Sequence, residues 1–105
     1  MAQTIGSKFK SARADSGVTQ LVAPSENTNG ITLCTAGITI PANLAWLNTG
    51  PVAPPNHFGM TTPAILVSGA GGATLPYPVV IPAGQGVWLS SYSTGFASIT
   101  YEPIV

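Results

Sequence analysis

The sequence predicts an all-β protein, a compact antiparallel β-sandwich of jelly-roll-like form with an extended N-terminal arm. Three observations predict this fold. Short runs rich in β-branched residues recur about every ten residues, with turn residues between them. No stretch repeats its apolar residues at helical spacing. The ten prolines fall mostly at the ends of these runs and in the loops between them, where a missing N–H removes no ladder hydrogen bond. The alternative is an immunoglobulin-like or other Greek-key sandwich, although the usual Cys…Trp…Cys pattern is absent.

The composition of the chain changes near residue 17. Residues 1–17 are polar, hold all three cations and lack strand periodicity, so we expect an extended arm there. Such a segment either orders against a neighbouring subunit or frays into solvent, and the sequence leaves both possibilities open. Residues 18–105 are expected to form a single β-sandwich domain, because domains typically hold about 100–150 residues.

Seven or eight short strands are expected after the arm. Asn29-Gly30 signals a tight turn between the first two strands, and Gly37 marks a bulge or bend in the second. A stiff, proline-rich loop follows at residues 51–63. Residues 93–95 (Ser-Thr-Gly) predict a hairpin between the last two strands. The expected strands are 18–23, 31–40, 44–48, 64–69, 77–81, 86–92 and 96–105.

One corner occurs twice, as "ITIPANLAWLN" and "VVIPAGQGVWLSS". Each copy has a strand that ends in Ile-Pro-Ala, a turn, and a strand that opens on Trp-Leu. The step from Pro41 to Trp46 is one residue shorter than the step from Pro82 to Trp88. Since strand side chains alternate between faces, the extra residue can turn the second tryptophan to the opposite side. We therefore expect one tryptophan in the core and the other free to serve an interface.

Charge is scarce and confined to the ends of the chain. Lys, Arg, Asp and Glu make up 6% of the residues, and none lies between residues 27 and 101. An uncharged body with zero net charge favours association, so we expect the outer surface to meet other subunits. A monomer coated with Ser, Thr and Asn is the alternative. Three cations are too few to indicate nucleic-acid binding. No apolar run approaches the roughly 20 residues of a membrane span, and no signal peptide is evident, so synthesis in a cytoplasm is expected.

The sequence shows no pattern of residues typical of a catalytic site. The three carboxylates belong to an expected arm, a turn and the last strand, and His57 is the single histidine. Cys34 lies in an apolar run, where a buried, inert thiol is expected. A metal site would have to be shared by several subunits, with His57 from each. The glycine-rich stretch at residues 68–74 lacks the Gly-Lys-[Ser/Thr] of a phosphate loop. We expect no enzyme activity and no cofactor.

Aromatic residues offer one further possibility, because exposed rings with Asn and Thr nearby are typical of carbohydrate sites. In the runs "AWL" and "VWL", however, the tryptophan alternates with smaller apolar residues, which favours packing in the core or at a subunit interface. The aromatic residues in question are Trp46, Tyr77, Trp88, Tyr92, Phe96 and Tyr101.

The second half of the chain resembles a known class of proteins. Residues 64–105 contain a strand ending in Ile-Pro-Ala-Gly, a Val-Trp-Leu strand, a Ser-rich tip and an "ASITYEP" strand. This pattern resembles the small β-sandwich proteins of tailed-phage virions, which include head-decoration (cement) proteins and tail-fibre tips. The resemblance lies in the order and composition of these segments, since no catalytic or ligand motif defines it.

The resemblance implies a non-enzymatic protein of the capsid surface, a symmetric trimer or dimer that bridges major capsid subunits and stabilises the assembled head. The rival implication is a tail-fibre or spike tip that binds a host glycan or surface protein. Neither implies a nucleic-acid or membrane partner. The functional residues implied are Lys8, Phe9, Lys10 and Arg13 for the capsid, and Trp46, His57, Phe58 and Trp88 for subunit contacts.

Overall fold

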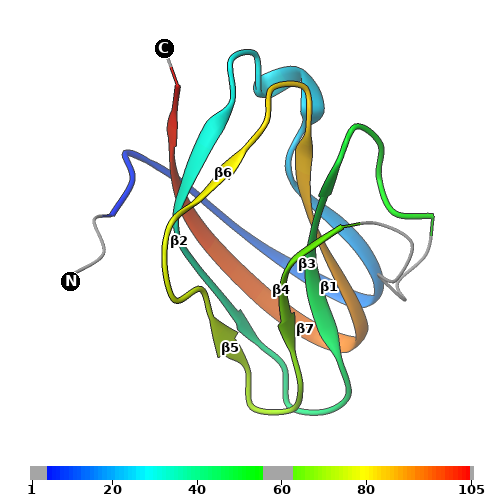
Figure 1. The fold of residues 1–105 in the computed structure, drawn as a ribbon. Coiled ribbons are helices and arrows are strands. Elements are labelled where there is room, and N and C mark those ends of the chain that lie inside the picture. The colour runs from blue at the N-terminus through cyan, green and yellow to red at the C-terminus, as the bar shows by residue number, and fades with distance from the viewer. Residues whose placement is uncertain (1–4, 56–62, 105) are drawn as a thin grey trace.

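One long strand organises the fold (Figure 1). The computed structural model describes residues 5–55 and 63–104. Strand β7 (Gly86–Pro103) pairs along most of its length with β1 (Lys8–Val22), in antiparallel orientation. The opposite edge of β7 is shared by β3 (Ala45–Gly50) and β2 (Ile31–Thr39). Next to these, β4 (Ala64–Ser68) pairs with β3, whereas β5 (Ala73–Thr74) and β6 (Val79–Ile81) pair with β2; a short 3-10 helix, η1 (Pro24–Glu26), follows β1.

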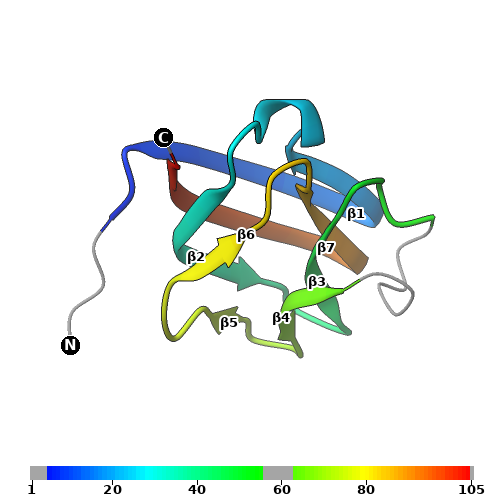
Figure 2. The ribbon, with the colours of Figure 1, turned by 45° about the horizontal axis from the view of Figure 1, so that its top comes forward.

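The sheet curls around one apolar core. The strands belong to a single antiparallel sheet, and its two ends meet where β4 contacts β5. Figure 2 shows the resulting barrel-like arrangement from a second direction. Leu33, Leu47 and Leu89, one from each of three adjoining strands, are completely buried in its interior. The predicted compact antiparallel all-β fold is therefore confirmed, with its layers joined in one curled sheet.

A bulge explains the alternation in β2. Ile31 and Leu33 face the core, the pairing with β7 then slips between Leu33 and Thr35, and from there the even-numbered residues Ala36 and Ile38 are buried. An extra residue in one strand reverses which parity faces inward. The bulge thus lies at Cys34, whereas Gly37, where the sequence predicts it, pairs regularly with Ser98 of β7.

Strands β1 and β7 bend together at a shared corner. Asp15 pairs with Thr94, but Gly17 pairs with Ser91, so Ser16 is left between the two regular stretches. Ser16 adopts a positive φ of 52°, and its hydroxyl donates a 2.8 Å hydrogen bond to the carbonyl of Tyr92. Figure 1 shows both ribbons turning at this point. The corner lets one pair of strands serve two walls of the barrel.

The structure corrects the predicted arm. Strand β1 begins at Lys8, so residues 8–17 are part of the sheet and the expected boundary between residues 17 and 18 falls inside a strand. The residues of this stretch on the inward side of the strand include the half-buried Lys10 and Ala12 and the buried Ala14, and none of them is a large apolar residue. Alanine is a weak strand signal, so the alternation was not recognisable from the sequence.

The predicted hairpin at residues 93–95 is also wrong. Residues 86–103 form one continuous bent strand, because both of its halves pair with β1. Gly95 fits the inside of the bend, where a Cβ atom would lie 2.9 Å from the Ser91 hydroxyl. Within the described part of the chain, no helix has the length and apolarity needed to cross a membrane.

Candidate interaction surfaces

The four residues predicted to contact a capsid lie on β1. Phe9 and Arg13 share the outward face of the strand, and Phe9 is 65% exposed. Lys8 and Lys10 alternate with them, and Lys10 is half-buried. Lys8, Phe9 and Lys10 line a small hollow together with Glu26 and Tyr101. The structure therefore brings three of the four together and places Arg13 further along the strand.

Arg13 belongs to a polar cluster at the corner of β1 and β7. Its Nε atom donates a 3.1 Å hydrogen bond to Oδ1 of Asp15, and its guanidinium lies 5.8 Å from the centre of the Phe96 ring. The Thr94 hydroxyl donates a 2.7 Å hydrogen bond to the same carboxylate oxygen. This bond, together with Arg13, lowers the pKa of Asp15 below its ordinary value. Asp15 therefore offsets the charge of Arg13.

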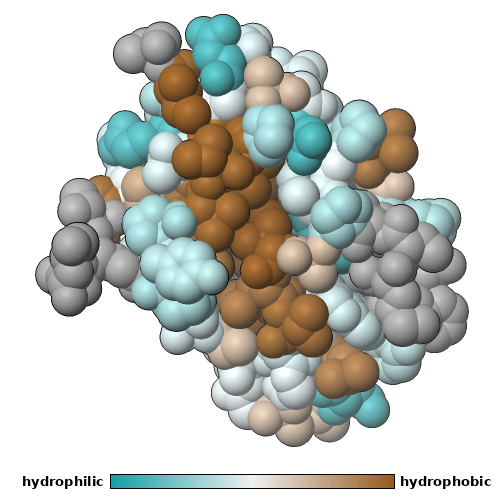
Figure 3. Space-filling model, in the orientation of Figure 1, coloured by the Kyte–Doolittle hydropathy of each residue, from teal (hydrophilic) through white to brown (hydrophobic). Residues whose placement is uncertain are grey.

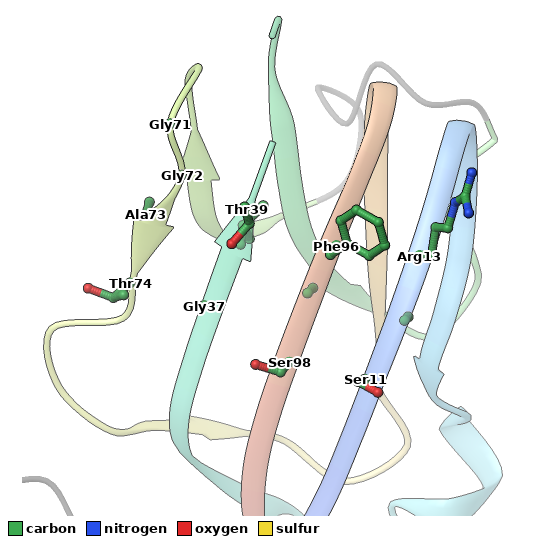
Figure 4. A pocket seen from close by; sticks show the side chains of 13 residues that line it. Ser11, Arg13, Gly37, Thr39, Gly71, Gly72, Ala73, Thr74, Phe96 and Ser98 are labelled. Carbon is green, nitrogen blue, oxygen red and sulfur yellow. The ribbon is translucent and has the colours of Figure 1, made fainter. Parts of the chain in front are cut away.

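Beside this cluster, a shallow trough crosses the outward face of β1, β7, β2 and β5 (Figure 4). Its position follows from the register of the four strands. Ser98 of β7 lies between Ser11 and Gly37, and Gly37 in turn pairs with Thr74. The next row of outward residues consists of Arg13, Phe96 and Thr39. Gly37 has no side chain, so the first row is recessed between Ser98 and Thr74.

Both tryptophans are buried on one face of β3 and β7. Trp46 is 6% exposed and Trp88 is 3% exposed, and neither belongs to the central core cluster. In the antiparallel register Trp46 lies opposite Ser90, and Asn48 lies opposite Trp88. The two rings therefore occupy diagonal positions on the face that points away from the core. The prediction that they lie on opposite faces, with one free for an interface, is wrong, because contacts within the chain already cover both rings.

Two local contacts hold this layer. The Ser90 hydroxyl donates a 2.7 Å hydrogen bond to Oδ1 of Asn48, and both residues are fully buried. Trp46 also packs against Tyr92, with ring centres 5.3 Å apart. Gly86 leaves room for the Trp88 ring, since a Cβ atom on Gly86 would lie 2.8 Å from that ring. The Gly-Gln-Gly turn thus supplies the space that the tryptophan fills.

The two Ile-Pro-Ala turns are held by different partners. Asn27, which is buried, donates hydrogen bonds from Nδ2 to the carbonyls of Pro82 (2.7 Å) and Gln85 (2.9 Å). At the first turn, the Ser93 hydroxyl donates a 2.9 Å bond to the Ala42 carbonyl. The turns are alike in sequence, but a separate tertiary contact stabilises each.

The described residues contain no obvious reaction centre. No group of three or more His, Cys, Asp or Glu side chains gathers in residues 5–55 and 63–104. Cys34 is buried, as predicted, and burial raises the pKa of its thiol. His57 and Phe58, which were predicted to serve subunit contacts, lie outside the described residues. The arrangement can bind, but it presents no activated nucleophile or acid–base pair among these residues.

Of the aromatic residues considered for carbohydrate, the structure leaves some at the surface and removes others. Trp46, Trp88 and Tyr101 are buried, whereas Tyr77 is 65% exposed and Phe96 is 49% exposed. The serines and threonines around Phe96 were missed by sequence reasoning. Only the strand register brings them beside the ring.

A second feature is an apolar stripe on the face of the barrel that Figure 3 shows. Figure 3 shows it running through the gap between β6 and the pair β3–β4. No ladder joins β4 to β6, so the sheet is open there. Near this opening, Ile65 and Leu66 of β4 and Val79 of β6 are only partly buried against the core. Apolar side chains therefore remain accessible along the opening.

Comparison with known proteins gives a likeness in fold. No family model and no curated protein sequence matches this chain. Among solved structures, a chain from the acidic stable capsid structure of Helicobacter pylori bacteriophage KHP30 matches with a TM-score of 0.59 and 11% sequence identity. The match establishes the fold. It covers 95% of this chain and 89% of that chain, so the two chains are of similar length and the likeness in fold extends over most of both.

Proposed function

We propose that this chain is a capsid decoration (cement) protein, a non-enzymatic subunit that binds the assembled phage head as a symmetric oligomer. The observation that carries the proposal is the likeness to a chain of a phage capsid over 95% of this chain and 89% of that one. Because both chains are short, the likeness is to a small chain of that capsid and not to one domain of a large subunit.

The surface supports this proposal. No Asp, Glu, Lys or Arg lies between residues 27 and 101, so most of the barrel exposes uncharged side chains. Large hydrophobic side chains are exposed on several elements, and an apolar stripe follows the opening of the barrel. Apolar surface of this kind marks interaction sites in soluble proteins. A shell and neighbouring copies of the chain would cover it.

The mechanism of such a protein is thermodynamic linkage. A subunit that binds the assembled shell, and not its separated parts, stabilises the shell by mass action. We assign the contact with the major capsid protein to Lys8, Phe9, Lys10 and Arg13, where positive charge and an exposed ring lie along one strand. This role locates the protein on the virion surface after synthesis in the host cytoplasm.

The copy number in purified virions tests the location. Quantitative mass spectrometry of purified virions should find hundreds of copies per particle. A handful of copies would indicate the rival, a tail-fibre or spike tip, and absence from virions would overturn both. Analytical ultracentrifugation of the isolated protein measures whether it is a dimer or a trimer.

A binding assay tests the assigned residues. Deleting residues 1–17 would remove much of β1, so point substitutions are the sharper tool. The assay uses phage heads from which this protein has been removed, here called protein-depleted heads. The double variant Lys8→Glu/Phe9→Ala should bind them at least tenfold more weakly than the wild type does, because it removes a cation and an exposed ring. Tyr77→Ala, which removes an equally exposed ring elsewhere, is the matched control. Undiminished binding by the double variant would refute the assignment of β1.

A further inference from the structure

The trough on the outward face of β1, β7, β2 and β5 has the dimensions of a ligand site. Its volume is about 770 Å³, within the range of roughly 300–1,000 Å³ that is usual for small-molecule sites. Residues from four strands and from the turn at Gly71 and Gly72 line it. Figure 4 shows Phe96 between Thr39 and Arg13, with Ser98 and Ser11 further along the same face.

The trough contains one exposed aromatic ring and several hydroxyl groups that make no hydrogen bond within the described part of the chain. Ser11, Ser98 and Thr39 are exposed on neighbouring strands, and Thr74 completes the set from β5. None of these four hydroxyls has a hydrogen-bond partner among the described residues. A hydroxyl both donates and accepts, which suits a partner that carries hydroxyls of its own.

Phe96 supplies the apolar part of the site. Its side chain is 49% exposed, although it lies on a central strand with β1 on one side and β2 on the other. The face of an aromatic ring packs well against the C–H groups of a pyranose. The guanidinium of Arg13 lies 5.8 Å from the ring centre, at the rim of the trough.

We propose that this trough is a binding site for a neutral oligosaccharide, with Phe96 as the stacking platform. A ring beside free hydroxyls matches the alternating C–H and O–H surfaces of a sugar. Neutrality follows from the lining: Arg13 is its one ionisable residue, and the adjacent Asp15 carboxylate offsets the charge. A phosphate or sulfate would find no cluster of cations here.

The backbone argues against a polypeptide strand as the ligand. The floor of the trough is formed by β7 and β2, and both edges of each strand are already paired at this level. Addition of a strand to the sheet needs an unpaired edge, which the floor does not offer. Recognition must therefore use side chains, as it does for a sugar.

The inference goes beyond the proposed function, because a site on the barrel wall would tether the particle to glycans whether the chain sits on the head or the tail. The test is binding of the folded protein to an array of neutral hexose and N-acetylhexosamine oligosaccharides, with sialylated and sulfated glycans on the same array. We expect neutral glycans to bind in preference to charged ones. Titration of the best glycan into ¹⁵N-labelled protein should shift the amide signals of Ser11, Gly37 and Ser98.

Two variants make the test specific. Phe96→Ala should weaken binding by about tenfold or more, through loss of the ring contact. Gly37→Val should block the floor and still fold, since a Cβ atom there meets nothing closer than 3.9 Å. Tyr77→Ala is the matched control and should bind normally. Failure of every neutral glycan to bind, or unchanged binding by both trough variants, would overturn the proposal.

Binding to heads separates this inference from the proposed function. Phe96→Ala should lose the glycan and still bind protein-depleted heads. If it loses the heads instead, the trough is a capsid contact and the saccharide assignment is wrong. If wild-type protein binds the glycan and never binds heads, the decoration role fails and the saccharide site stands.

Discussion

The hydroxyl of Ser90 donates a 2.7 Å hydrogen bond to Oδ1 of Asn48, in a layer where both side chains are fully buried. The register of β3 and β7 sets this pair between the diagonal positions of Trp46 and Trp88. The bond satisfies polar atoms on a face that the sequence would suggest is apolar. It joins the two strands that carry the tryptophans.

Ser90→Ala should destabilise the protein. The substitution removes the donor and leaves the Asn48 oxygen buried without this bond, which costs about 1–3 kcal/mol. A fall of roughly 4–8 °C in Tm is expected for each kcal/mol lost. Calorimetry measures it, with the exposed Ser98→Ala as control, and equal Tm values for the two variants would contradict the buried bond.

Trp88→Ala should act on stability and leave association to other residues. The ring is 3% exposed, and truncation of a buried tryptophan typically costs about 3–5 kcal/mol. Chemical denaturation followed by the fluorescence of Trp46 measures the loss. Under conditions where the variant is folded, its oligomeric state should match that of the wild type, and a folded variant that dissociates would restore Trp88 to an interface.

Substitutions at the two glycines before β5 distinguish the cost of backbone strain from the cost of steric overlap. Gly71 and Gly72 both have positive φ values, 99° and 103°, but a Cβ atom on Gly72 would also overlap the carbonyl oxygen of Ile38, whereas nothing lies near Gly71. Gly71→Ala should cost about 1–3 kcal/mol through backbone strain alone. Gly72→Ala should cost more. Urea titration measures both, and equal losses would exclude the close approach to Ile38.

Asn27→Asp should weaken the turn between β6 and β7. The amide donates to the carbonyls of Pro82 and Gln85, and a carboxylate would direct negative oxygen at both acceptors. Loss of the two bonds costs about 1–3 kcal/mol, and buried charge adds to it. Because protonation relieves the repulsion, the deficit should shrink as the pH falls below the pKa of the new carboxyl. A deficit that is the same at acid and neutral pH would contradict this account.

Asp15 should titrate below an ordinary aspartate. The Thr94 hydroxyl and Arg13 favour the carboxylate and lower its pKa. A lowered folded-state pKa adds stability that is present above the unfolded-state pKa and is lost as the pH falls through the folded-state value. Thr94→Val should therefore raise the pKa of Asp15, as measured by NMR, and its stability should match the wild type only at acid pH. An unshifted pKa in Thr94→Val would show that the hydrogen bond has no effect.

The elements that the sequence predicted best are the strands whose ends are marked by proline or glycine. Prolines and glycines marked the ends of strands near residues 31–40, 44–48 and 64–69, and the structure has strands there. The first ten residues of β1 were missed because lysines and alanines, and no large apolar residues, alternate with the outward positions, and the continuity of β7 was missed because Ser-Thr-Gly is also a turn sequence. Local patterns report hydrophobicity and turns, and they cannot report which strand lies alongside.

The candidate sites show the same limit. The residues of the trough come from four strands, and only their register places Ser11, Ser98 and Gly37 in one row beside Phe96. The tryptophans show the same limit. The number of residues from each proline to its tryptophan predicted opposite faces, whereas both rings lie on one face. The corresponding positions of the two corners, Asn43 and Gly84, both have a positive φ, 69° and 81°, so the extra residue of the second corner follows this position.

The sequence by itself determined the class of the fold, the scarcity of charge and the burial of Cys34, because composition and alternation act locally along the chain. Tertiary structure alone decided that the basic segment is a strand, that both tryptophans share one buried layer, and that Phe96 lies beside a row of hydroxyl side chains. These features depend on pairing between residues as far apart as Lys8 and Tyr101. A partner at that distance leaves no mark on the spacing of neighbouring residues.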